Sequence, residues 1–191
     1  MAYFADLSPY AYFHEGRTPE TLSVGWLSRE HEFAAREPAK NLLDSLLQFC
    51  KVSVFQSRGL HPCEFCSELN WVTVAARDGL ELNLGSAEIR VLSPDGFIFA
   101  APTLIFHYVA VHNYKPPASF LMALESGNCR PPSHCYFRKL KELNLEWRPT
   151  LTAASGGLSS KMPLSDGVYM KFDGTVVWPD GTRIESSRFG S

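Results

Sequence analysis

The stretch HPCEFC (residues 61–66) and the later stretch HYVAVH (residues 107–112) decide what fold this chain can adopt. Two residues between the thiols of the first stretch let the chain turn back, so that both sulfurs reach one ion. The second stretch carries two histidines at a spacing found in zinc-finger helices. The sequence therefore predicts one structural zinc ion held by four side chains: Cys63, Cys66, His107 and His112.

The histidine pair constrains the helix that carries it. Pro102-Thr103 introduces a helix from Leu104 to about His112, and five residues on an ideal helix subtend roughly 140° net. The two rings therefore share a face only if the last turn loosens. Asn113 and Pro116 follow directly, and both favour such a loosening.

The segment between the two ligand pairs has strand character. Short turns with Asp-Gly, Gly-Ser and Pro-Asp-Gly separate its apolar runs, and strands joined so closely must be antiparallel. In the third run the alternation places Glu88 and Arg90 opposite Ile89, which predicts a half-buried meander. The expected strands are residues 71–76, 80–84, 87–92 and 97–101.

The flanking chain completes an α+β fold, an antiparallel meander packed with several short helices and followed by a C-terminal β-hairpin. Apolar stripes, prolines and Gly-Asn stops predict helices over residues 39–50, 104–112, 118–125 and 136–143. Short strands are expected at 22–26 and 52–55, and the C-terminal strands at 168–172, 175–178 and 182–185. The expected organisation is a zinc-stabilised domain (1–148), a Ser/Gly-rich linker (149–166) and a hairpin segment (167–186).

Composition sets the remaining expectations. A formal charge of −2 and a pI of about 6.3 give the whole chain no electrostatic footprint for nucleic acid or anionic lipid. The N-terminus lacks the pattern of a signal peptide and the longest apolar run, 97–101, is too short to span a bilayer, so a cytoplasmic location is expected. In that compartment disulfides are rare, and paired cysteines indicate metal or redox sites.

Other assignments of the cysteines and histidines stay open at this point. His61 is a spare ligand that could replace one of the later histidines. A second ion could be held by Cys129, His134 and Cys135, whereas Cys50 lies on the apolar face of a helix and is expected in the core.

Three competing functions have a basis in the sequence. A zinc deaminase needs a third ligand followed two residues later by a glutamate, and neither His14 nor His31 is followed by one at that spacing. A thioredoxin-like site would place the cysteines at a helix start within a βαβ unit. A nucleic-acid-binding finger would need basic residues on the ligand-bearing helix, whereas the basic run is 138–141.

Several strings outside the metal ligands carry a resemblance. They are FADLSPY (4–10), GWL (25–27), RGLHPCEFC (58–66), LGSAEIRV (84–91) and APTLIFHYV (101–109), with His112, Tyr114 and Pro116-Pro117. In these strings the chain resembles a family of small uncharacterised bacterial proteins, a domain of unknown function, over about residues 3–125. The resemblance implies a bacterial, cytosolic, single-domain protein with the Cys and His segments in its core, and it assigns no activity.

The sequence therefore favours a non-enzymatic zinc protein that acts as a protein–protein interaction module. Accessory or immunity proteins of bacterial toxin and defence systems have a similar size and charge. This comparison is an analogy at the level of the fold and identifies no site. The alternatives are a zinc-dependent hydrolase or deaminase-like enzyme, in which water replaces one ligand, and a nucleic-acid-binding zinc finger.

Overall fold

The structure is a computed structural model that describes residues 2–12, 20–57, 59–67, 72–76, 79–126, 129–150, 152 and 161–186. The described helices are α1 Lys40–Cys50, α2 Ile105–His112, α3 Ala118–Ser126 and α4 His134–Glu142. The strands are β1 Thr21–Ser23, β2 Val52–Val54, β3 Thr73–Ala75, β4 Glu81–Asn83, β5 Glu88–Leu92, β6 Ile98–Pro102, β7 Trp147–Pro149, β8 Lys161–Ser165, β9 Val168–Lys171, β10 Val176–Val177 and β11 Arg183–Ile184. None of these helices is long and apolar enough to cross a membrane. The α+β class is confirmed.

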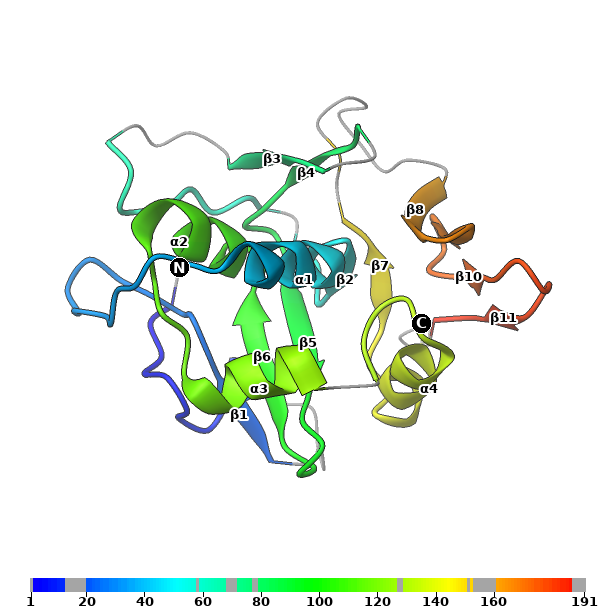
Figure 1. The fold of residues 1–191 in the computed structure, drawn as a ribbon, viewed down its shortest axis with the longest axis horizontal. Helices are drawn as coiled ribbons and strands as arrows, with labels where there is room; N and C mark the ends of the chain where they lie inside the picture. The colour runs from blue at the N-terminus through cyan, green and yellow to red at the C-terminus, as the bar shows by residue number, and fades with distance from the viewer. Residues whose placement is uncertain are drawn as a thin grey trace.

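A five-stranded mixed sheet forms the centre, in the order β1-β6-β5-β2-β7 (Figure 1). Strands β5 and β6 pair antiparallel from Glu88↔Pro102 to Leu92↔Ile98, while β1 runs parallel to β6. The predicted four-stranded meander is wrong, because β3 and β4 form a separate two-stranded sheet and β5 pairs with β2. Gly85, with a φ of +95°, turns the chain between β4 and β5. The turn separates the strand pair β3–β4 from the strand pair β5–β6.

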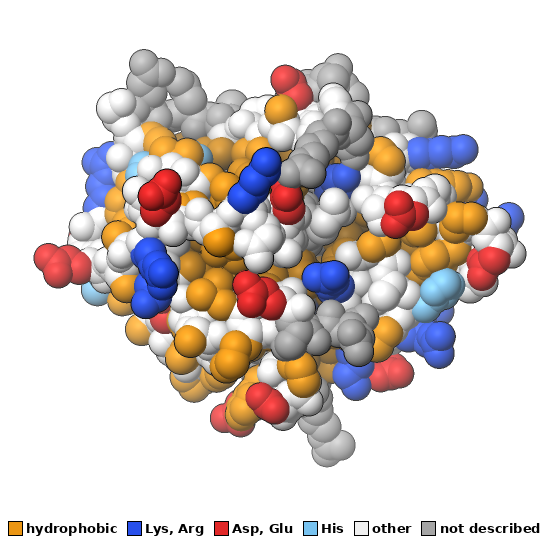
Figure 2. Space-filling view, in the orientation of Figure 1, with side chains coloured by type: hydrophobic (Ala, Val, Ile, Leu, Met, Phe, Trp, Pro, Cys, Tyr) orange, Lys and Arg blue, Asp and Glu red, His pale blue; other side chains and the backbone are white. Residues whose placement is uncertain are grey.

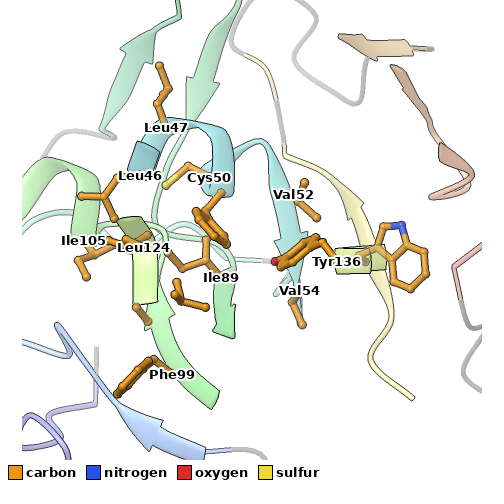
Figure 3. Packing of buried hydrophobic residues seen from close by; sticks show 14 of the residues in the cluster. Leu46, Leu47, Cys50, Val52, Val54, Ile89, Phe99, Ile105, Leu124 and Tyr136 are labelled. Carbon is orange, nitrogen blue, oxygen red and sulfur yellow. The ribbon is translucent and has the colours of Figure 1, made fainter. Parts of the chain in front are cut away.

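One face of the central sheet packs against helices. Helices α1 and α3 both contact β5, and Ile89 of that strand lies close to Cys50 of α1 and Leu124 of α3 (Figure 3). The apolar side chains that meet there include Leu46, Cys50, Ile89, Phe99 and Leu124. The stripe predicted for α1 is confirmed, because its buried residues are Leu46, Leu47, Phe49 and Cys50.

The other face of β5 is covered as well. Glu88 is 3% exposed and Arg90 is 2% exposed, so the predicted half-buried strand is wrong. The reason is tertiary: the N-terminal segment folds across this face, and the Tyr10 hydroxyl donates to the Glu88 carboxylate. Alternation predicted which side chains share a face of the strand, but it did not predict what covers that face.

The C-terminal strands form a second antiparallel sheet, in the order β11-β10-β9-β8. Its turns carry Asp166-Gly167, Asp173-Gly174 and Asp180-Gly181, each with glycine at positive φ. Strand β8 lies inside the stretch that the sequence suggested as a linker. Trp147 of β7 joins the two sheets, since its indole Nε1–H donates to the Gly174 carbonyl at 2.8 Å. The domain division at residue 148 stays a prediction.

Candidate metal centre

The four predicted ligands converge. Cys63 Sγ lies 3.3 Å from His112 Nε2, and Cys66 Sγ lies 3.3 Å from His107 Nε2 and 3.5 Å from His112 Nε2. The two imidazole Nε2 atoms are 3.2 Å apart. All four ligand atoms lie within 4.8 Å of one another, and among the described residues this is the single group of three or more potential ligands that meets so closely.

These spacings suit a tetrahedral zinc ion. Bonds of about 2.0 Å to nitrogen and about 2.3 Å to sulfur predict ligand–ligand edges of roughly 3.3–3.8 Å. The observed sulfur–nitrogen distances of 3.3 to 3.5 Å and the nitrogen–nitrogen distance of 3.2 Å are close to that range. The donor set of two sulfurs and two nitrogens is one that structural zinc uses.

The knuckle owes its shape to contacts made by the residues around the cysteines. Cys63 is buried, and the Arg29 guanidinium donates to the carbonyl of Cys66 at 3.2 Å. Phe65, between the two thiols, packs edge-on against Tyr108 with ring centroids 5.7 Å apart. It also lies 5.5 Å from the ring of His112. The knuckle is therefore anchored to α2 by an aromatic contact as well as by the ligand atoms.

The last turn of α2 is loosened, as the histidine spacing required. The N–H groups of Asn113 and Tyr114 both donate to the Tyr108 carbonyl, five and six residues back in place of the helical four. Asn113 then ends the helix with a φ of +54°. The widened turn brings His112 round beside His107.

The titration behaviour of the group is that of a desolvated site. Burial and, to a smaller extent, the charge of a protonated His112 together lower the pKa of His107 to about 4. Burial also lowers the pKa of His112 and raises that of the Cys63 thiol. Neutral imidazoles have free lone pairs for a metal, whereas the thiolates need a cation beside them, which a divalent ion supplies.

His61 does not join the ligand group. Its backbone N–H donates to the Gly85 carbonyl at 2.9 Å, and the residue lines a small hollow beside β5. The suggestion that His61 replaces one of the later histidines is therefore not supported by the geometry.

The second metal site is contradicted. Cys129 and Cys135 are joined by a disulfide, so neither sulfur is free to ligate, and the ring of His134 stacks on Trp178 at 3.9 Å. A disulfide also departs from the expectation of a reducing compartment. Cys50, Cys63 and Cys66 are the free cysteines, and Cys50 is in the core as predicted.

The residues required by the competing functions lie elsewhere or are not described. His31 stacks on Tyr3 with ring centroids 3.6 Å apart, and His14 lies outside the described residues. Helix α2 carries no lysine or arginine, and Lys139 of the basic run pairs with Glu142 at 3.1 Å on the surface of α4.

Sequence reasoning missed the aromatic shell of the site. Phe33 packs against Phe65 at 5.3 Å and against Tyr114 at 5.8 Å. The Tyr114 hydroxyl donates to the carboxylate of Asp6 at 2.8 Å, which ties the N-terminal segment to the end of α2. Phe65, Tyr108 and Tyr114 lie in the strings that carry the resemblance, whereas Phe33 lies outside them and had no signal in the sequence.

Comparison with known proteins identifies a family to which no activity is assigned. The profile of the family described as "Domain of unknown function (DUF7919)" matches residues 2–125, which include all four ligands of the candidate centre. No curated protein and no solved structure matches the chain. Because the match spans more than half of its length, the chain belongs to the DUF7919 family.

Proposed function

We propose that the chain is a non-enzymatic zinc-binding protein in which the metal is structural and the folded domain docks on another protein. The observation that supports the metal is the convergence of Cys63, Cys66, His107 and His112 at tetrahedral spacing. Their donor atoms come from a loop and a helix separated by roughly forty residues of sequence, so the ion would crosslink distant parts of the fold.

The ligand count favours a structural role over a catalytic one. Catalytic zinc keeps three protein ligands and an open position for water or substrate. Here four side chains reach the same point, and Phe65 packs against the ring of His112 beside it. A zinc hydrolase or deaminase would require one of these four ligands to be displaced.

A protein partner is the second part of the proposal. Val111 of α2 is 57% exposed and Met122 of α3 is 60% exposed, so both helices present apolar side chains to solvent. A hollow of about 240 Å³ lies between the start of α1 and α3, with Leu42 and Leu121 among its walls. Figure 2 shows hydrophobic side chains interspersed with both signs of charge on this helical face. Such a composition favours contact with a protein partner over contact with the phosphate backbone of a nucleic acid.

Metal content and coordination test the first part. Protein purified without chelator should contain close to one zinc per chain, and X-ray absorption should give a first shell of two sulfurs and two nitrogens. A folded protein that contains no metal, or a shell with one open oxygen position, would contradict the structural assignment.

Co-expression with the products of neighbouring genes tests the second part. We expect one of them to form a stable complex with this chain by size exclusion, as accessory or immunity proteins of bacterial toxin and defence systems do with their partners. The substitutions Val111→Asp and Met122→Asp should weaken that complex. Phe172→Asp, which changes a residue of 50% exposure next to β9, is the matched control. Equal weakening by all three substitutions would argue against a site on the helices.

A further inference from the structure

A second candidate site is a hollow whose lining includes none of the four candidate metal ligands. A hollow of about 30 Å³ lies next to the beginning of β5. Its walls include the aromatic rings of Tyr12, Trp26 and Phe55, and its lining also includes Ser86 and Glu88. The volume accommodates a terminal group of roughly one or two heavy atoms.

Ser86 gives the hollow an unsatisfied polar group. The residue is 3% exposed, and within the described ranges its Oγ has no hydrogen-bond partner. Buried hydroxyls in native proteins are almost always hydrogen-bonded, so an orphan hydroxyl in the lining of a hollow indicates a missing partner. Its neighbour Ser57 instead donates to the Ser86 carbonyl at 3.0 Å.

Glu88 supplies an acceptor with spare capacity. Its Oε2 accepts a hydrogen bond from the Arg90 guanidinium at 2.6 Å and lies 2.8 Å from the Tyr10 hydroxyl. Among the described residues, the donor near Oε1 is the same Tyr10 hydroxyl. A tyrosine has one hydroxyl proton to share between the two oxygens. The carboxylate therefore has lone pairs left for a further donor.

Aromatic rings in this part of the fold already accommodate a cation. The Arg90 guanidinium lies over the Tyr10 ring at 4.9 Å and over the Phe55 ring at 5.1 Å. Phe55 also lines the hollow, together with Trp26 and Tyr12, and the last is 40% exposed at its mouth. Aromatic faces attract a cation through their quadrupole.

The candidate metal ligands account for only part of the strings that carry the family resemblance. Other residues from several of these strings line this hollow. The string LGSAEIRV (84–91) contributes Gly85 to Glu88, and the strings GWL and RGLHPCEFC contribute Trp26 and His61. Pro102 at the end of β6 completes this side. Residues from four separate strings thus share one lining.

We propose that this hollow binds a primary alkylammonium group, either of a small amine or of a lysine side chain. The ammonium donates to Ser86 Oγ and to Glu88 Oε1, and its methylenes leave the hollow past the ring of Tyr12. A carboxylate would be repelled by Glu88, and a guanidinium has too many atoms for the volume. The site does not depend on the proposed zinc or docking functions.

Titration of the full-length protein, as purified, with n-butylammonium chloride tests the proposal. We expect saturable amide chemical-shift changes at residues 85–88 in NMR spectra, with 1-butanol and butyrate binding at least tenfold more weakly. Equal binding of 1-butanol and butylammonium, or shifts that do not saturate, would overturn the proposal.

Two variants locate the binding. Ser86→Ala should weaken butylammonium binding roughly tenfold, because it removes a hydrogen bond to a charged group. Ser23→Ala is the matched control: Ser23 is also fully buried with an unpartnered hydroxyl, but it does not line the hollow. Tyr12→Ala, at the exposed mouth, should weaken binding roughly two- to fivefold without disturbing the core. Unchanged affinity in both Ser86→Ala and Tyr12→Ala would contradict the assigned site.

The source of the ammonium is decided by comparing peptides. A short blocked peptide with one lysine that binds more tightly than butylammonium, and more tightly than its norleucine counterpart, would assign the site to a protein partner. Binding of butylammonium with no binding of the lysine peptide would assign it to a free amine. Failure of both ligands overturns the proposal even if zinc is present at one ion per chain.

Discussion

Gly85 lies against the backbone of His61 so closely that a Cβ on Gly85 would be 2.3 Å from the His61 carbonyl oxygen. The His61 N–H donates to the Gly85 carbonyl at 2.9 Å, so the two residues are linked as well as packed. His61 leads into the metal knuckle and Gly85 leads into β5. This contact therefore positions both the candidate metal centre and the hollow beside it.

Gly85→Ala should lower the free energy of unfolding by at least about 2 kcal/mol, because a side chain here meets backbone and also requires a positive φ. Zinc retention should fall with it. Gly79→Ala is the matched control, since Gly79 has a φ of +78° with no atom within 4 Å of its Cβ position. Chemical denaturation and metal analysis of both variants give the comparison. Equal destabilisation would show that the contact with His61 contributes nothing.

Removal of the metal should destabilise the fold by an amount comparable to its total stability. Structural zinc in finger peptides contributes on the order of 10 kcal/mol, against a typical domain stability of about 5–15 kcal/mol. A strong chelator should therefore lower the melting temperature by tens of degrees or unfold the protein, and added zinc should restore it. Magnesium chloride is the control addition. A melting temperature that does not respond to chelator would rule out the structural ion.

The cysteines should differ sharply in their tolerance of substitution. Cys63→Ser and Cys66→Ser should give poorly folded, metal-free protein, because each removes a thiolate from the ligand group. Cys50→Ala should cost about 1 kcal/mol, since it removes a small buried side chain whose Sγ lies 3.6 Å from the Thr103 carbonyl. Thermal melts with zinc analysis measure the order. The reverse order would identify Cys63 and Cys66 as ordinary core thiols.

The buried Glu88–Arg90 pair should show strong coupling. Arg90→Met leaves the Glu88 carboxylate buried without its cation and should cost about 3–5 kcal/mol. The double variant Glu88→Gln/Arg90→Met should lose less than the sum of the two single changes. Urea unfolding of the four proteins gives the coupling energy. The exposed pair Lys139–Glu142 is the control, and its coupling should be below about 1 kcal/mol.

The disulfide between Cys129 and Cys135 should contribute about 2 kcal/mol through the short loop that it closes. Reduction by a thiol, at a constant concentration of zinc, should lower the free energy of unfolding of the parent protein by that amount. The free energy of unfolding of the double variant Cys129→Ser/Cys135→Ser should not change. Mass spectrometry after alkylation without reductant should find the two cysteines linked. Alkylation of both cysteines under those conditions would contradict the pairing.

Local chemistry in the sequence was enough to predict much of the fold. Pro38, the apolar stripe of α1 and the Pro116-Pro117 stop predicted helices that the structure contains. The spacing within 61–66 and 107–112 predicted the four residues that converge, and the geometry of an ideal helix predicted that the turn at His112 must open. Helix α4 begins earlier than expected because the Ser133 side chain accepts a hydrogen bond from the N–H of Tyr136.

Strand partners could not be predicted in the same way. The pairing of β5 with β2, the parallel pairing of β1 with β6 and the separation of β3 and β4 depend on contacts between segments distant in sequence. Short turns restrict the direction of neighbouring strands, but they do not determine which strand fills the next place in the sheet. Alternation in β5 likewise carried no information on the N-terminal segment that covers Glu88 and Arg90.

By itself, the sequence predicted the four candidate ligands, because two thiols at knuckle spacing and two imidazoles on one helix form a donor set that structural zinc uses. Only the tertiary structure decided that His61 lies outside the ligand group, that Cys129 pairs with Cys135, and that Ser86 and Glu88 line a hollow beside Trp26. The physical reason is distance along the chain. A metal knuckle is specified by residues within one or two turns, whereas a buried hollow is built from side chains that only the folded backbone brings together.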